Sequence, residues 1–459
     1  MPLHPGPAET PAVMTAGTAL ATAPGNPAGT SAGTSAGTAG TVPGEVAELR
    51  PARSAATDQD GLVATDLDVL TGPGAGALLT AAVATAGGEV TTWSVRQVDH
   101  RPGRSTTVSY RASVRWPHGV RGETLGASLG RPDDAQRPGV VALADGDRTA
   151  VVWMFQDDPG LPALRPLHEP RALARLLRDL CVPDAGGPVR LQVLAYRPTR
   201  RAVVEASTPR GRVFLKVVRP DRVEALHARH ALLADAGLPV PRPLGWTDNG
   251  LVALAPLHGT PMREVVRDGG RAPSPAQVLE LLDRLPAAVR GLPRRRSWSE
   301  GAAHYAAVIG IVLPQEAERA ARLAAAVTDA VAGDPGDEPT HGDLYEAQVL
   351  LTGGRITGLL DVDSAGPGHR ADDLGCLVAH LETLSLLRGW DAPRLRAYAR
   401  EHARAYADAV GADALAVRTA GVLLSLATGP HRVQEAGWRE ATSRRLDAVE
   451  RWLDGTALR

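Results

Sequence analysis

The pattern of apolar residues changes near residue 258, and this change limits the fold more than any other feature of the sequence. Before it, short apolar runs bounded by turn residues predict strands, as at residues 213–218. Beyond it, apolar residues recur at the spacing of amphipathic helices, as at residues 316–331. A strand-rich part followed by a helix-rich part predicts an α+β fold of two lobes with a cleft between them.

Four segments are predicted along the 459 residues. Residues 1–58 are rich in Ala, Gly, Thr and Pro and have little to bury, so we expect a disordered tail. Residues 59–160 mix a short helix with pairs of strands, which predicts an extra N-terminal α+β module. Residues 161–257 then form a strand-rich N-lobe, and residues 258–459 a helical C-lobe.

Two predicted hairpins resemble each other in sequence. Residues 97–104 and 192–200 both begin with Gln-Val, continue to an aromatic ring and end in Arg-Pro-x-Arg. The likeness indicates either the duplication of one sheet module or a chance similarity between two arginine-rich turns.

The charge balance argues against two classes of partner. The formal net charge is -1, whereas proteins that bind nucleic acids or membrane surfaces gather an excess of Lys and Arg. We therefore expect neither partner. The first 25 residues lack the regions of a secretion signal, and we see no continuous apolar stretch of about 18 residues. A cytoplasmic protein is the expectation.

Lys216 is the one lysine of this sequence, in which Lys and Arg together number 50. A general bias toward arginine explains the composition but does not explain why one lysine remains. A compact ammonium and a planar guanidinium suit different binding geometries. Lys216 lies on the predicted strand at 213–218, and its presence therefore indicates a site that requires lysine.

Two aspartates stand at the ends of linked segments. Asp343 lies in the run at residues 340–348, and Asp361 follows two short predicted strands joined by a Gly-Gly turn. Such a short hairpin brings both carboxylates to one edge. One carboxylate could accept the proton of an attacking hydroxyl while the other holds Mg²⁺ between phosphates.

The run His-Gly-Asp-Leu-x-x-x-Gln, followed by Leu-Leu-Asp and Ala-Asp-Asp-Leu, resembles the aminoglycoside phosphotransferase and choline kinase superfamily. These proteins are small-molecule kinases with a protein-kinase-like fold. The resemblance spans about residues 188–455 and is densest at 339–380. It implies an ATP-dependent kinase of a small-molecule hydroxyl, with ATP and Mg²⁺ as its cofactors.

The resemblance also implies roles for the residues at matching positions. Asp343 corresponds to the catalytic base, and Asp361 corresponds to the metal aspartate. Lys216 corresponds to the lysine that binds the nucleotide phosphates. His341 and Asp373 correspond to a structural brace of the catalytic loop.

The second implied metal ligand, Gln348, departs from the family pattern, which usually has Asn there. Both side chains offer a carbonyl oxygen that Mg²⁺ accepts, but Gln is one methylene longer. The departure leaves open an alternative of another class, a catalytically weak pseudokinase that acts as a nucleotide-binding regulator.

The rest of the nucleotide site is less specific in the sequence. Glu224 is the candidate ion-pair partner of Lys216, although an exposed acid at a helix start is the alternative. His230 lies on the same predicted helix, nearer the place that the family spacing suggests. At the lobe hinge, the carbonyl of Ala255 and the N–H of Leu257 are expected to bind adenine.

The acceptor is the least determined part of the prediction. His431, Arg432 and Trp438, in a break between helices, are weak candidates for an acceptor pocket, and an ordinary helix joint is the alternative. A sugar, an amino alcohol and an aminoglycoside all remain open. The extra N-terminal module resembles in layout the cap of the maltokinase-like branch, which favours a sugar kinase as one alternative.

Overall fold

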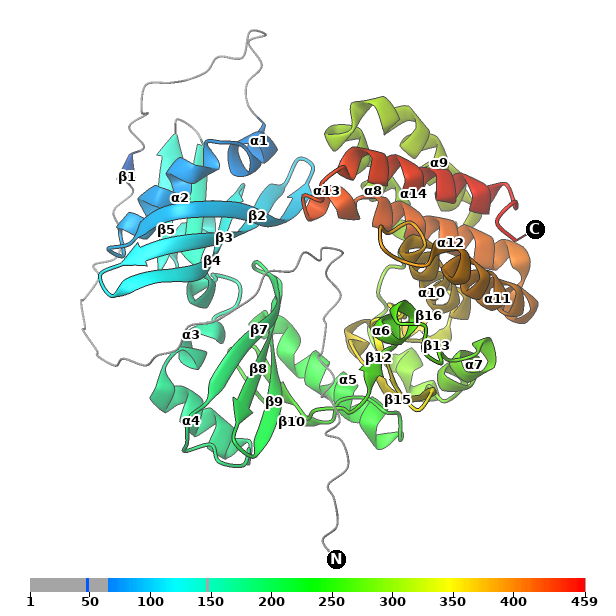
Figure 1. The fold of residues 1–459 in the computed structure, drawn as a ribbon, viewed down its shortest axis with the longest axis horizontal. Coiled ribbons are helices and arrows are strands. Elements are labelled where there is room, and N and C mark those ends of the chain that lie inside the picture. Colours follow the sequence, from blue (N-terminus) through cyan, green and yellow to red (C-terminus); the bar gives the residue numbers. More distant parts are fainter. Residues whose placement is uncertain (1–46, 49–64, 146–147, 459) are drawn as a thin grey trace, which may run out of the picture.

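The computed structural model describes residues 47–48, 65–145 and 148–458, so almost all of the predicted tail at 1–58 lies outside the described residues. The described chain forms an N-terminal sheet module, a second sheet with its helices, and a helical part (Figure 1). The predicted class, a two-lobed kinase-like α+β fold with an extra N-terminal module, is confirmed.

The N-terminal module is an antiparallel sheet that packs against two short helices. Its elements are α1 (Asp66–Thr71), α2 (Ala75–Ala84), β2 (Glu89–Arg101), β3 (Ser105–Trp116), β4 (Gly119–Leu129), β5 (Val140–Asp145) and β6 (Arg148–Met154). The strand order is β5-β6-β4-β3-β2, and β1 (Ala47–Glu48) pairs with β5 in parallel. Tyr110 of β3 is buried and donates its hydroxyl to the carbonyl of Leu70, which ties the helices to the sheet.

Strand β4 is missing from the prediction because glycines interrupt its apolar pattern. One of them, Gly126, is required by packing: a Cβ there would lie 2.4 Å from the indole of Trp153 on the neighbouring strand β6. A single sequence shows the gap in the pattern but not the tryptophan that fills it.

The second sheet forms the N-lobe. Its elements are α3 (Leu164–Leu167), α4 (Pro170–Asp179), β7 (Arg190–Arg197), β8 (Arg201–Thr208), β9 (Gly211–Val218), α5 (Val223–Asp235), β10 (Pro243–Thr247) and β11 (Leu251–Leu254). The strand order is β10-β11-β9-β8-β7, and every pairing is antiparallel.

The two sheets share one topology, which favours duplication over chance similarity. Counted from β2 and from β7, the five strands follow the same order, and two helices precede each set. The matching hairpins close alike, with Arg101 and Arg197 each accepting an N–H three residues on. The residues between, Gly103 and Thr199, both have a left-handed φ, of 69° and 58°. Between its third and fourth strands the first sheet has a short 3₁₀ turn in place of α5.

The C-lobe is built around the helices α10 and α12, which pack against each other and against α11 and α14. Its helices are α6 (Met262–Arg267), α7 (Pro275–Asp283), α8 (Ala302–Val312), α9 (Ala317–Ala330), α10 (Arg370–Leu384), α11 (Ala392–Val410), α12 (Ala412–Ala427), α13 (Gly429–Arg432) and α14 (Trp438–Leu453). The side chains of Ser274 and Gln277 form a capping box at the start of α7. Helix α12 begins after Gly411, which has a φ of 89°, so Asp413 lies in its first turn and is not its N-cap.

The stretch Ala412–Arg432 is long and apolar enough to cross a membrane, and it is the one such stretch among the described residues. Of its most apolar window, 61% is buried inside the fold, as is usual for the core helix of a globular domain.

Short strands at the inner edge of the C-lobe carry the aspartates of the motif. They are β12 (Thr260–Pro261), β13 (Glu338–Thr340), β14 (Val349–Thr352), β15 (Arg355–Leu359) and β16 (Gly366–Gly368). Strand β14 pairs with β15, and β13 pairs with β16. Asp343 therefore lies between β13 and β14, and Asp361 lies two residues after the end of β15.

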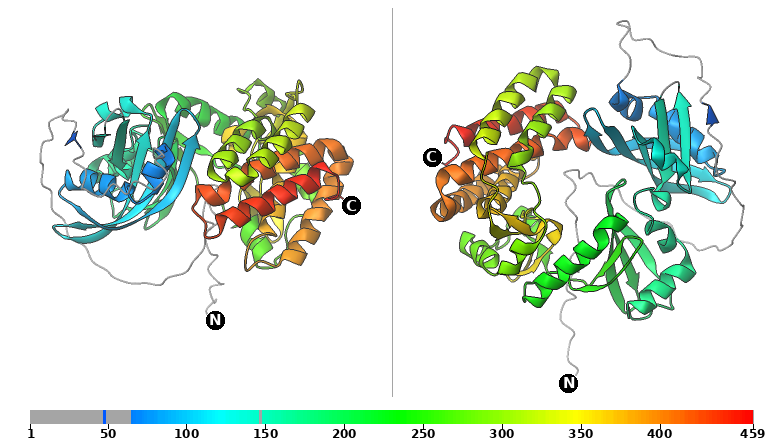
Figure 2. Two further views of the ribbon diagram at one scale, coloured as in Figure 1. Left: turned by 90° about the horizontal axis from the view of Figure 1, so that it is seen from above. Right: turned by 180° about the vertical axis from the view of Figure 1, so that it is seen from behind.

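The N-terminal module reaches across to the C-lobe. Strand β2 contacts α13, and the hairpin β2–β3 points toward that helix in all views (Figures 1 and 2). All three parts of the described chain therefore surround the space in front of the motif.

Candidate active site

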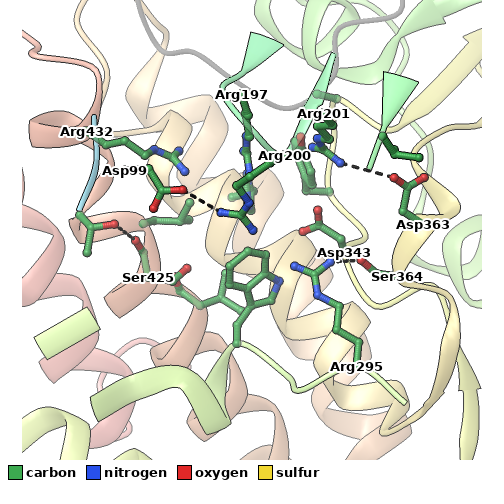
Figure 3. Close-up of a pocket in the computed structure, with 18 of the residues that line it drawn as sticks. Asp99, Arg197, Arg200, Arg201, Arg295, Asp343, Asp363, Ser364, Ser425 and Arg432 are labelled. Carbon is green, nitrogen blue, oxygen red and sulfur yellow. Dashed lines mark hydrogen bonds and ion pairs between the residues drawn. The ribbon is translucent and has the colours of Figure 1, made fainter. Parts of the chain in front are cut away.

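A cavity of about 830 Å³ lies where the three parts meet. Its walls come from the β2–β3 hairpin with Asp99, the β7–β8 turn with Arg200, the catalytic loop with Asp343, and α13 with Arg432 (Figure 3). A loop at the start of the C-lobe adds Arg295, which points toward the centre. The cavity therefore combines residues that are hundreds of positions apart.

The catalytic loop is held rigidly from beneath. The carboxylate of Asp373 accepts the backbone N–H groups of His341 and Gly342, both at 2.7 Å. The ring of His341 bonds the carbonyl of Leu360 through Nε2 and accepts the N–H of Asp343 at Nδ1. Gly342 has a φ of 78°, and a Cβ there would lie 2.5 Å from the carbonyl oxygen of Ser364. The predicted brace residues thus fix the loop that presents Asp343.

The environment of Asp343 suits a proton acceptor. Burial raises the pKa of its carboxyl, and the nearby carboxylate of Asp361 raises it further, while Arg295 opposes both effects. A raised pKa makes a carboxylate a better base than it would be in water. Asp343 lines the cavity, so its carboxylate can meet a bound hydroxyl.

The prediction that Glu224 pairs with Lys216 is wrong. Glu224 is exposed on α5, whereas Lys216 is only 3% exposed and lies on β9. The ammonium of Lys216 instead bonds Asp361 Oδ1 at 2.8 Å and the carboxylate of Asp363. On α5, the charge of Lys216 acts on His230. Burial and repulsion by Lys216 lower the pKa of His230 to about 4.

Arg201 completes a buried ion-pair cluster with Lys216. Its guanidinium lies 3.2 Å from Asp361 Oδ1 and 3.6 Å from Asp363 Oδ2. Although burial acts in the opposite sense, Arg201 and Lys216 hold the pKa of Asp361 well below its usual range. Asp361 also adopts a left-handed φ of 54°, a backbone state that non-glycine residues rarely adopt and that clusters at functional sites.

One observation bears on the metal ligands implied by the sequence. The side chain of Gln348 is buried, its Nε2 lies 2.8 Å from the hydroxyl of Tyr345 and 3.4 Å from Asp361 Oδ2, and its Oε1 has no partner among the described residues. An unpartnered amide oxygen beside a carboxylate is a donor set that Mg²⁺ accepts. No cluster of three His, Cys, Asp or Glu side chains occurs in the described ranges, so water and phosphate oxygens would complete such a site.

The expected hinge residues lie apart from the cavity. Neither Ala255 nor Leu257 is among its lining residues. Leu257 packs on an apolar cluster that spans both lobes and includes Phe214 and Leu350. In the described part of the chain, the N–H of Leu257 and the carbonyl of Ala255 have no backbone partner. The hinge thus adjoins an apolar contact between the lobes.

Of the three acceptor candidates, one lines the cavity. Arg432 lies on its wall, with Ser425 and Thr428 near it in sequence. His431 and Trp438 are not lining residues, because their rings pack edge to face on each other at 4.8 Å and form the joint between α13 and α14. Their assignment to the acceptor pocket is therefore corrected.

Several residues of the site were not predicted. Asp363 stands two positions after Asp361, so the Asp-x-Asp spacing offered a signal for it. Arg295 lies in a run of three arginines at residues 294–296, bonds Ser364 and lines the cavity. Asp99 has no signal in the sequence, because its contact with Arg200 joins residues 101 positions apart.

The β7–β8 turn is pinned by a buried carboxylate outside the motif. Asp158 accepts the N–H of Thr199 and the hydroxyl of Tyr196, at 2.8 and 2.7 Å. That hydroxyl also accepts the indole N–H of Trp153, from the N-terminal module, at 2.9 Å. These bonds hold a threonine at a strained left-handed φ of 58°, and they fix the turn that carries Arg200 into the cavity.

The turn also leads into Arg201, which bonds Asp361 and Asp363. We therefore expect Asp158→Ala to loosen this turn and to raise the KM for nucleotide by about tenfold, since three hydrogen-bond donors lose their acceptor. Thr199→Gly, which removes the strain and keeps the bond, is expected to leave the KM near that of the wild type. Steady-state kinetics on the three proteins measure the effect. An unchanged KM in the alanine variant contradicts a positioning role for Asp158.

A pH dependence follows from the same carboxylate. Burial raises the pKa of Asp158 to about 6, above its value in an unfolded chain. Ionised Asp158 therefore costs stability, and this cost is absent below about pH 4 and complete above about pH 6. Relative to wild type, Asp158→Asn should gain up to about 3 kcal/mol in free energy of unfolding as the pH rises from 4 to 7. Denaturant unfolding at several pH values tests the slope.

The comparisons with known proteins agree with the catalytic loop. Residues 199–418 match the model of a family described as the phosphotransferase enzyme family. No curated protein matches the sequence. Similar solved structures include a choline/ethanolamine kinase family protein from Mesorhizobium loti, with 19% identity over 63% of this chain and 95% of that chain and a TM-score of 0.43.

Two further similar structures are phosphotransferases. A macrolide 2′-phosphotransferase from Brachybacterium faecium is 22% identical over 60% of this chain and 98% of that chain, with a TM-score of 0.38. An aminoglycoside phosphotransferase solved with ADP and hygromycin B is 15% identical over 61% and 98%, with a TM-score of 0.41. The family model and the braced catalytic loop, rather than these weak structural likenesses, carry the assignment. Residues 199–418, just under half of the chain, thus match the phosphotransferase enzyme family, in agreement with the resemblance that the motif at residues 340–348 indicates.

Proposed function

We propose that this protein transfers the γ-phosphoryl group of ATP to a hydroxyl of a small polar molecule, with the help of Mg²⁺. The observation that carries the proposal is the placement of Asp343 in one cavity with Arg201 and Asp363, the partners of the buried Lys216–Asp361 pair. The match to the phosphotransferase family model supports phosphoryl transfer, and the donor, the metal and the acceptor are parts of the proposal.

In the proposed reaction, the acceptor oxygen attacks the γ-phosphorus while the bond from that phosphorus to the β–γ bridging oxygen breaks. The hydroxyl proton passes to the carboxylate of Asp343, and the nucleoside diphosphate leaves with the bridging oxygen. Asp343 is suited to this step because burial and Asp361 raise its pKa. Catalysis consists mainly of positioning and charge neutralisation.

Lys216 and Arg201 are the cations placed to neutralise the phosphates. Both cations bond Asp361 and Asp363, and in the proposed reaction the phosphate oxygens would share them with these carboxylates. Bound Mg²⁺ would add positive charge between the phosphate oxygens. Gln348 Oε1 and the carboxylate of Asp361 are the residues that would hold it.

A second candidate is a nucleotide-binding regulator that transfers no phosphoryl group. It is favoured by Gln348, whose Nε2 donates to Asp361 Oδ2 at 3.4 Å, an oxygen that a bound metal ion would also use. A maltokinase-like sugar kinase also stays a hypothesis, since it rests on the layout of the N-terminal module alone.

A screen of sugars, amino alcohols, aminoglycosides and their acidic or phosphorylated derivatives for ATP consumption tests the proposal. We expect at least one acceptor to stimulate Mg²⁺-dependent consumption in the wild-type protein. Mg²⁺-dependent ATP binding with no consumption across the panel would favour the regulator instead.

A further inference from the structure

Arginines outnumber carboxylates among the residues that line the cavity. Thirteen arginines line it, against five carboxylates. Three of those carboxylates already have cationic partners: Asp363 is bound by Lys216, Glu346 by Arg263, and Asp99 by Arg200. Several lining arginines, among them Arg131, Arg219 and Arg267, also pair with acids outside the lining, whereas Arg432 has no ion pair among the described residues.

Part of this charge lies away from the phosphoryl-transfer residues. Figure 3 shows Arg432, Asp99 and Ser425 on one side of the cavity, with Asp343 and Asp363 on the other. Arg432 comes from α13 of the C-lobe and Asp99 from the N-terminal hairpin. Under the proposed function the nucleotide would engage the side with Asp363, which would leave the side with Arg432 for the acceptor.

The arginines on the Arg432 side repel one another. Burial lowers the pKa of Arg197 to about 9, and the charges of Arg201, Arg432 and Arg200 add to that effect. Burial also lowers the pKa of Arg432, and the one acid that opposes this most is Asp99. The Nε of Arg432 is a buried atom with no partner among the described residues. Such a group gains stability when an anion binds between its members.

Resting on the proposed function, we infer that the acceptor carries an anionic group, a phosphate or a carboxylate, which binds between Arg432, Arg200 and Arg197. The hydroxyl of the same molecule then points toward Asp343. Asp99 forms an ion pair with Arg200 at 3.1 Å, so its carboxylate competes with the anionic group of the acceptor for this guanidinium. The inference opposes polycationic aminoglycosides, choline-like amino alcohols and neutral sugars such as maltose.

The binding test uses inorganic phosphate as a probe, by calorimetry, with Mg²⁺ and a non-hydrolysable ATP analogue filling the triphosphate site. We expect phosphate to bind the wild-type protein, and Arg432→Gln to weaken binding about 10- to 100-fold, as for the loss of a charge-assisted hydrogen bond. Arg404→Gln, the same change at an exposed position of α11, is the matched control and should have no effect. Asp99→Asn should change binding in the opposite direction and strengthen it.

The kinetic test compares glucose, glucose 6-phosphate and gluconate as acceptors, so that the phosphate and carboxylate arms are separated. We expect an anionic acceptor to exceed glucose in kcat/KM by at least about tenfold, with the difference lost in Arg432→Gln and the KM for ATP unchanged. Equal phosphate binding by wild type and Arg432→Gln, or a neutral or cationic acceptor that is preferred, overturns the inference. The proposed function fails separately, when no acceptor receives a phosphoryl group although phosphate binding still depends on Arg432.

Discussion

Asp343→Asn is expected to lower kcat by about 10²- to 10⁴-fold, the range that a positioned general base contributes. The amide keeps the shape of the side chain but cannot accept the hydroxyl proton. Because the loop is held by His341 and Asp373, the substitution should leave it in place. Rapid-quench or steady-state measurement of product formation gives the effect.

The matched control is Asp408→Asn, the same change at an exposed position of α11, which should leave kcat unaltered. Nucleotide binding, measured separately, should be almost unchanged in Asp343→Asn. Normal turnover by this variant, with nucleotide still bound, contradicts the assignment of Asp343 as the base.

Lys216→Arg is expected to lower kcat/KM for ATP by about 10- to 100-fold, although it keeps the charge. Lys216 is 3% exposed and its ammonium bonds two carboxylates, so the larger planar guanidinium has no room to reproduce the same contacts. Arg201 already places a guanidinium beside Asp361, so a second guanidinium at position 216 would duplicate that contact and would not replace the ammonium.

Two further variants make the result specific. Lys216→Met should lose more activity than Lys216→Arg, because it leaves Asp361 and Asp363 with Arg201 as their remaining bonded cation. Arg404→Lys, at an exposed position of α11 away from the cavity, should be neutral. If the Lys216→Arg variant had the kcat/KM of the wild type, the presence of a single lysine in this sequence would have no connection with the site.

The fold could be predicted to a large extent because its signals are local. Strand and helix periods gave the two lobes and most of their elements, and the Arg-Pro-x-Arg likeness pointed to hairpins whose turns have the same backbone form. Strand β4 was missed, since Gly126 is explained by Trp153 on another strand. The spacing of apolar residues along one strand does not show which side chain of a neighbouring strand packs against it.

The candidate site was predictable where the motif is continuous. Asp343, His341 and Asp361 come from one short stretch, and the structure brings them together. The partner of Lys216 was not predictable, because Asp363 lies 147 positions away while Glu224 lies near in sequence but on an exposed face of α5. Proximity along the chain was a poor guide to proximity in the cavity.

The contribution of the N-terminal module to the cavity was also beyond the sequence. Asp99 meets Arg200 across 101 positions, and Trp153 meets Tyr196 across 43. Both contacts depend on how two similar sheets pack against each other, which no residue pattern specifies. The N-terminal module therefore supplies residues that line the cavity.

The most direct test of phosphoryl transfer follows ATP, Mg²⁺ and the best acceptor from the screen by ³¹P NMR. The wild-type protein should form ADP and a new phosphomonoester in equal amounts, and Asp343→Asn should form neither at a comparable rate. Release of inorganic phosphate without a phosphomonoester, or equal product from both proteins, would contradict the account.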